Sequence, residues 1–144
     1  MTITRLHSRE RSRGQALAEF ALIMPLFAVI LLGLLDFGRV IYAQNTVSEA
    51  AREASRVGSV SPSASATKYS AMRSAAITRS PGLGLASGDI VGNGCTDCFY
   101  PDGAITGGRV VVKVTKSVQL LTPIISQIVG GSFTVTSTSR TFIQ

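Results

Sequence analysis

The chain has 144 residues and a formal net charge of +6, yet only 15 % of its residues are charged and 45 % are hydrophobic. This length limits the protein to one modest soluble domain and one membrane segment. Much of the positive charge lies in the first 13 residues, where Arg5, Arg9, Arg11 and Arg13 accompany a single Glu10. No basic stripe with interleaved aromatic residues follows, so we expect these arginines to set membrane topology rather than to bind nucleic acid.

The next segment is apolar and long enough to span a membrane. Residues 20–35 contain no ionisable side chain, and residues 16–19 extend the run to about 20 residues, which matches a hydrocarbon core of ~30 Å. Arginines ahead of this run predict a cytoplasmic N-terminus and an extracytoplasmic remainder. The run exceeds the roughly 7–15 apolar residues of a secretory signal peptide, so we expect it to remain as an anchor.

Glu19 is the one charged residue inside this window. A carboxylate within lipid costs about 2.5–3.5 kcal/mol on insertion scales, so an acid at this place is a functional candidate. The alternative is that Glu19 lies at headgroup depth and extends its carboxylate to the polar surface.

Residues 14–20 (GQALAEF) resemble the cleavage site of type IV prepilins. A wider set of landmarks resembles the TadE-like family, the pseudopilins of the tight-adherence (Flp) pilus system. These landmarks are residues 13–22, Pro25, residues 35–39 (LDFGR) and residues 50–56 (AAREASR). The family often has Tyr after the Glu, where this chain has Phe20.

The resemblance implies that a membrane prepilin peptidase cuts after Gly14. Gln15 would then carry the new amine, and Glu19, followed by Phe20, would be the fifth mature residue. It also implies that Glu19 pairs with the amine of a neighbouring subunit, which would offset the desolvation of its carboxylate. The expected partners are this peptidase, other pilins or pseudopilins, the pilus assembly machinery and membrane lipid.

Helical periodicity continues beyond the apolar run. Asp36 and Arg39 are three residues apart and predict an ion pair at the bilayer exit. Small apolar residues then recur at intervals of three and four, and Gly58 and Pro62 are stop signals. This stripe comprises Val40, Ala43, Val47, Ala50 or Ala51, Ala54 and Val57. We predict one helix from about residue 15 to residue 57, whose second half packs on the chain's own C-terminal domain.

The remainder has the pattern of a small α+β domain. Residues 66–79 predict a short amphipathic helix, and residues 89–91 a short strand. Strict alternation over residues 109–119 and β-prone residues over 132–143 predict an antiparallel pair of strands. Between them, Thr122-Pro123 and Gly130-Gly131 bound a predicted short helix whose apolar face packs in the core or touches the membrane surface.

Cys95 and Cys98 are the only cysteines. A structural zinc site needs four ligands, and the one histidine, His7, stands in the basic leader. A thioredoxin-type redox site would need a βαβ setting, whereas these residues are flanked by turn signals. An extracytoplasmic location favours a local structural disulfide, with the redox module as the weaker alternative.

The sequence therefore predicts a pilin-like α+β protein with a long N-terminal helix on a small antiparallel sheet. Residues 1–14 form a basic cytoplasmic leader, 15–58 the helix with a membrane segment at about 16–37, and 59–144 the extracytoplasmic domain. No catalytic constellation, metal site, cofactor or small-molecule substrate is expected. The predicted function is a TadE-like pseudopilin or minor pilin in the bacterial inner membrane, or in the extracellular pilus after processing. The alternative is an uncleaved single-pass membrane protein with a partner-binding outer domain.

Overall fold

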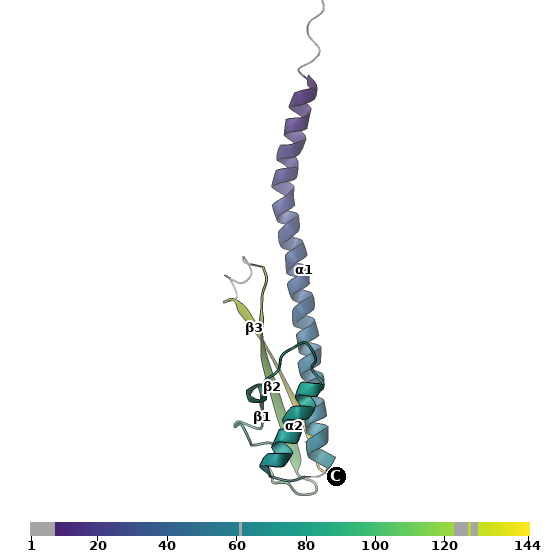
Figure 1. Cartoon of the computed structure of the whole chain (residues 1–144), viewed down its shortest axis with the longest axis vertical. Helices are drawn as coiled ribbons and strands as arrows, with labels where there is room; N and C mark the ends of the chain where they lie inside the picture. Colours follow the sequence, from purple (N-terminus) through teal and green to yellow (C-terminus); the bar gives the residue numbers. More distant parts are fainter. Residues whose placement is uncertain (1–7, 61, 123–126, 128–129) are drawn as a thin grey trace, which may run out of the picture.

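A computed structural model describes residues 8–60, 62–122, 127 and 130–144, with side chains in the first helix from residue 14 onward. It consists of a long helix and a small domain that packs beside the C-terminal half of that helix (Figure 1). The elements in order are α1 (Ser8–Val60), α2 (Ala66–Thr78), the 3-10 turn η1 (Ser87–Asp89), β1 (Ile90–Val91), β2 (Arg109–Gln119) and β3 (Ser132–Phe142). The predicted α+β class is confirmed.

Helix α1 is longer at both ends than the sequence predicted. It begins at Ser8 rather than near Gln15 and passes through Pro25 without a break. A proline removes only one helical hydrogen bond, which a helix of 53 residues tolerates. The expected stop at Gly58 is wrong as well, because this glycine lies inside the helix where a neighbouring element leaves no room. A Cβ atom there would stand 2.8 Å from both Met72 Cε and Val110 Cγ1.

The three strands form one antiparallel sheet in the order β1-β2-β3. Strands β2 and β3 pair without interruption from Arg109 opposite Phe142 to Gln119 opposite Ser132. The end of the hairpin at which Gln119 pairs with Ser132 points along α1 towards its N-terminal half (Figure 1). The predicted short helix within the connection between these strands falls mostly on residues outside the described part of the chain.

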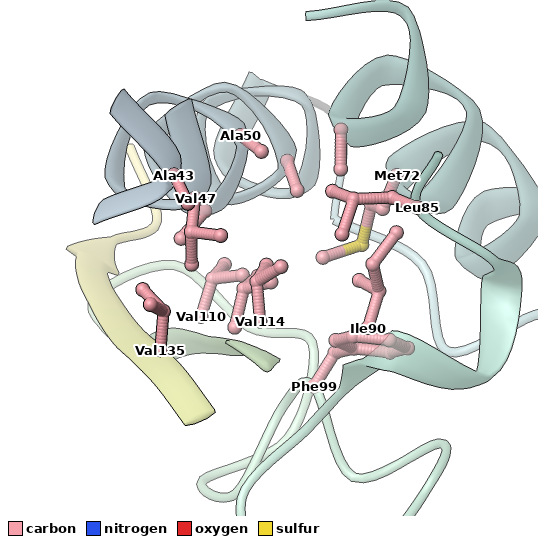
Figure 2. Close-up of a cluster of buried hydrophobic side chains, with 14 of the residues drawn as sticks. Ala43, Val47, Ala50, Met72, Leu85, Ile90, Phe99, Val110, Val114 and Val135 are labelled. Atoms are coloured by element: carbon pink, nitrogen blue, oxygen red, sulfur yellow. The ribbon is translucent and has the colours of Figure 1, made fainter. Parts of the chain in front are cut away.

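The core lies between the C-terminal half of α1, the sheet and α2 (Figure 2). The predicted small-residue stripe supplies the helix side, with Ala43, Val47, Ala50, Ala51 and Ala54 all at most 1 % exposed. These short side chains let the backbone of α1 approach the sheet closely. Opposite them lie the alternate valines of β2, together with side chains from α2, β1 and the loop after β1. These residues are Val110, Val112, Val114, Met72, Ile90 and Phe99.

The contact between α1 and β3 includes a cluster of hydroxyl groups in addition to the buried Val135. Ser55 Oγ lies 2.7 Å from Ser139 Oγ and accepts a hydrogen bond from Thr141 Oγ1 at 3.1 Å. It also donates to the carbonyl of Arg52 at 2.9 Å. Ser55 is 1 % exposed, so these bonds satisfy a polar group that would otherwise be costly to bury.

An arginine fastens the loop that follows β1 to α2. The guanidinium of Arg73 donates to the Thr96 carbonyl at 2.8 Å and to the Asp97 carboxylate at 2.6 Å. It also stands 5.1 Å from the centroid of the Phe99 ring, within the range of a cation–π contact. Arg73 therefore holds both the polar part of this loop, at Thr96 and Asp97, and its buried residue, Phe99.

Tyr100 ties the same loop to the end of α1. Its hydroxyl donates to the Gly58 carbonyl at 3.0 Å, and burial raises the pKa of this phenol above 10.0. A raised pKa means that the folded state holds the proton more tightly, so this contribution is intact below pH ~10 and is lost as the pH rises further. We expect Tyr100→Phe to cost about 1 kcal/mol at pH 8 through the lost hydrogen bond. Denaturant unfolding at pH 8 and pH 11 should show the gap between Tyr100→Phe and wild type closing at the higher pH; a gap that widens would contradict this assignment.

Candidate processing and membrane segment

The first half of α1 carries large apolar side chains on every side, and the domain leaves them uncovered. Leu22 is 79 % exposed and Leu34 65 %. Other large apolar residues of this half are also exposed: Leu17, Phe20, Ile23, Met24, Leu26, Phe27, Ile30, Leu31, Leu32 and Leu35. Only 6 % of the most apolar 18-residue window is buried, whereas the core helix of a soluble protein would be mostly covered. By length and composition this helix could cross a membrane.

The predicted processing motif lies within the same helix. Gly14 has open space around the position where a side chain would stand. One turn later, the side-chain amide of Gln15 donates to Glu19 Oε1 at 3.2 Å. Positions 15 and 19 therefore share one helix face, and a backbone amine created at Gln15 would begin the helix one turn from the carboxylate. The structure contains no peptidase or neighbouring subunit, so the roles of Gly14, Gln15, Glu19 and Phe20 stay predictions.

Asp36 ends the apolar segment in a way that the sequence did not indicate. The predicted ion pair with Arg39 is wrong: it is not among the ion pairs of the described residues. The Asp36 carboxylate instead accepts hydrogen bonds from the backbone N–H groups of Leu121, at 2.9 and 3.1 Å, and Thr122, at 2.8 Å. Asp36 is 3 % exposed, so backbone donors from the β2–β3 connection replace the water that it loses.

Beyond Asp36 the helix changes from a bare rod to a docked element. Tyr42 donates its hydroxyl to the Pro81 carbonyl at 2.9 Å, which ties the start of the docked half to the segment after α2. Glu53 and Arg56 form an ion pair at 2.6 Å near the end of the helix. The helix is thus uncovered before Asp36 and docked on the domain after it.

The cysteines lie in the loop after β1. Their sulfur atoms are bonded, and their Cα atoms are 5.3 Å apart. Gly92 N–H donates to the Cys95 carbonyl and Asn93 N–H to the Cys98 carbonyl, so tight turns surround the pair. Within the described residues, no three His, Cys, Asp or Glu side chains gather as metal ligands. The loop thus presents a locally cross-linked turn.

These features define a small α+β domain carried on an N-terminal helix whose first half could lie in a membrane. Residues 14–56 match the family model of TadE-like proteins, so the resemblance predicted from the motifs is confirmed over this segment. The match begins at Gly14 and ends within α1, and the TadE-like segment is therefore the helix itself. No curated protein and no solved structure matches the chain. A TadE-like segment on an apolar N-terminal helix indicates a membrane protein associated with a Tad pilus.

Proposed function

We propose that this protein is a pseudopilin or minor pilin of a Flp-type pilus, inserted with its N-terminus in the cytoplasm and cut after Gly14. The observation that carries the proposal is the uncovered apolar half of α1, which starts at the GQALAEF motif and holds Glu19 near its beginning. Such a surface needs either lipid or the helices of other subunits around it. A pilin uses both in turn, first as a membrane protein and then as a filament subunit.

Processing would change the charge of the N-terminus as well as its length. The first 14 residues contain four arginines and one glutamate, so their removal lowers the formal net charge from +6 to +3. The basic arm that favours retention on the cytoplasmic side would be lost. What remains is an apolar helix end with one amine and one carboxylate, which can exchange lipid contacts for contacts with neighbouring helices.

N-terminal sequencing of the protein isolated from its native membrane tests this proposal. An amino terminus at Gln15 supports processing by a prepilin peptidase. An amino terminus at Met1 or Thr2 would support the alternative, an uncleaved single-pass protein whose outer domain binds a partner.

Glu19 provides a second test, at the level of assembly. We expect Glu19→Ala to be inserted into the membrane but to enter filaments at least about tenfold less than wild type, because breaking a charge pair in a low-dielectric setting costs about 3–5 kcal/mol. Quantitative immunoblotting of sheared filaments and of membranes measures the two pools. Glu49→Ala, at an exposed position of the docked half, is the matched control. Equal incorporation of both variants would contradict a pairing role for Glu19.

A further inference from the structure

Asp36 fastens the β2–β3 connection to α1 at the end of the apolar segment. Its two carboxylate oxygens accept the N–H groups of Leu121 and Thr122, which lie 85 and 86 residues further along the chain. Leu120 N–H also donates to the Gly131 carbonyl, which closes the hairpin just behind this point. The position of the connection along the helix is therefore fixed.

That position coincides with the outer boundary of the predicted membrane segment. At 1.5 Å per residue, a helix that enters the hydrocarbon at residue 16 leaves it about 20 residues later, near Asp36. Figure 1 shows the end of the β2–β3 hairpin beside this part of α1, pointing towards its apolar half. Leu121 and Thr122, whose N–H groups donate to Asp36, thus lie near the depth at which acyl chains would meet headgroups.

Leu121, within the connection, and Phe133, just after it, are large apolar residues that the domain covers only in part. Leu121 is 59 % exposed and Phe133, opposite Val118 in the sheet, is 45 % exposed. Next to Asp36 on the helix, Phe37 is 63 % exposed. Phe37 follows the uncovered half of α1 directly along the helix, and the backbone of Leu121 is held at Asp36, the preceding residue. The lipid that would surround that half is therefore the nearest apolar occupant for these side chains.

We propose that Leu121 and Phe133 form a second membrane contact, inserted at the boundary between acyl chains and headgroups of the outer leaflet, and that Asp36 holds them at this depth. The inference rests on the proposed membrane insertion of α1. The contact braces the domain against the bilayer at a second point beside the helix. It is released when the subunit leaves lipid, which exposes Leu121 and Phe133 for contact with other subunits.

The chain contains no tryptophan, so each single-Trp variant carries one emitter of its kind. The full chain is reconstituted into phospholipid vesicles with Trp at Leu121, Phe133, Leu26 or Phe142. Phe142 is 68 % exposed at the opposite end of β3 and is the matched control, whereas Leu26 reports the membrane span. We expect lipids brominated near the headgroup end of the acyl chain to quench Leu121→Trp and Phe133→Trp severalfold more than Phe142→Trp.

The outcomes separate this inference from the membrane proposal beneath it. Quenching of Leu26→Trp by deeply brominated lipids, with Leu121→Trp and Phe133→Trp as unquenched as Phe142→Trp, would overturn the second contact alone. A Leu26→Trp variant that no brominated lipid quenches would overturn both. Blue-shifted, unquenched emission from Leu121→Trp that grows with the protein-to-lipid ratio would assign the surface to a second copy of the chain, against the inference.

The role of Asp36 is tested in the same system with Asp36→Asn added to Leu121→Trp. We expect quenching to fall towards the level of Phe142→Trp, because the amide offers the connection one acceptor and no charge. Asp36→Asn combined with Phe142→Trp should keep its emission spectrum, which shows that the domain remains folded. Unchanged quenching of Leu121→Trp in the presence of Asp36→Asn would overturn the positioning role.

Discussion

Replacing Gly14 with Ala is expected to leave essentially the whole population as a precursor that retains residues 1–14. The structure shows that the substitution does not disturb the chain itself, because nothing lies within 4 Å of the added Cβ and the residue sits in a helix. Alanine even favours the helix by about 1 kcal/mol relative to glycine. Any loss of cleavage therefore reports on recognition by the peptidase. The resemblance to TadE-like proteins and prepilins implies that this peptidase requires glycine at this position.

Intact-mass spectrometry of membrane-extracted protein measures the outcome. The precursor keeps a net charge of +6, against +3 for the processed form, so isoelectric focusing provides an independent reading. Gly38→Ala is the matched control, because Gly38 lies in the same helix, also has open space at the Cβ position and stands outside the GQALAEF motif of residues 14–20. Gly14→Ala protein with the mass of processed wild type would argue against cleavage at this peptide bond.

Local patterns predicted most of the elements of this fold because each element is encoded by neighbouring residues. The alternation of valines over residues 109–119 and the stripe from Ala43 to Ala54 both record which face is buried. Those faces meet in the structure as predicted. The bounds of α1 were less accurate because Gly58 is a stop signal by propensity. Its tight packing against Met72 and Val110 overrides this preference.

Contacts between distant segments were not predictable from such patterns. Asp36 has a charged neighbour one turn away, and the sequence favoured that ion pair. In the structure, two backbone donors from the β2–β3 connection provide a better partner for a buried carboxylate. The link between Ser55 and Ser139 is similar, since nothing local marks one serine among many as a buried acceptor. The motif around Gly14 needs only adjacent residues, which explains why the TadE-like segment could be recognised whereas the contact of Asp36 with the β2–β3 connection could not.

Replacing Gly92 with Ala should destabilise the domain more than any other single added methyl group at its described glycines. A Cβ at this position would stand 2.5 Å from the Phe99 nitrogen and closer still to the Cys98 carbonyl group. Both groups belong to the backbone, so no side-chain rotation relieves the overlap, whereas the nearest atoms at Gly58 belong to the side chains of Met72 and Val110. The loop must move, and it carries Phe99, which is fully buried in the core.

The expected cost is about 3 kcal/mol or more, at the upper end for overpacking, since two turn hydrogen bonds are strained along with the core. These are the bonds from Gly92 N–H to the Cys95 carbonyl and from Asn93 N–H to the Cys98 carbonyl. A domain with a total stability of about 5–15 kcal/mol would lose a large share of it. Urea unfolding of the full chain in mild detergent, followed by tyrosine fluorescence, measures the shift in midpoint.

Gly88→Ala is the matched control for this substitution, because Gly88 lies four residues away with open space at its Cβ position and no left-handed backbone. We expect its free energy of unfolding to stay within about 0.5 kcal/mol of that of wild type. Equal midpoints for Gly92→Ala and Gly88→Ala would show that the loop does not hold Phe99 in place. A loss confined to Gly92→Ala, with or without reducing agent, would assign the anchoring of this loop to backbone packing around Phe99 rather than to the Cys95–Cys98 bond.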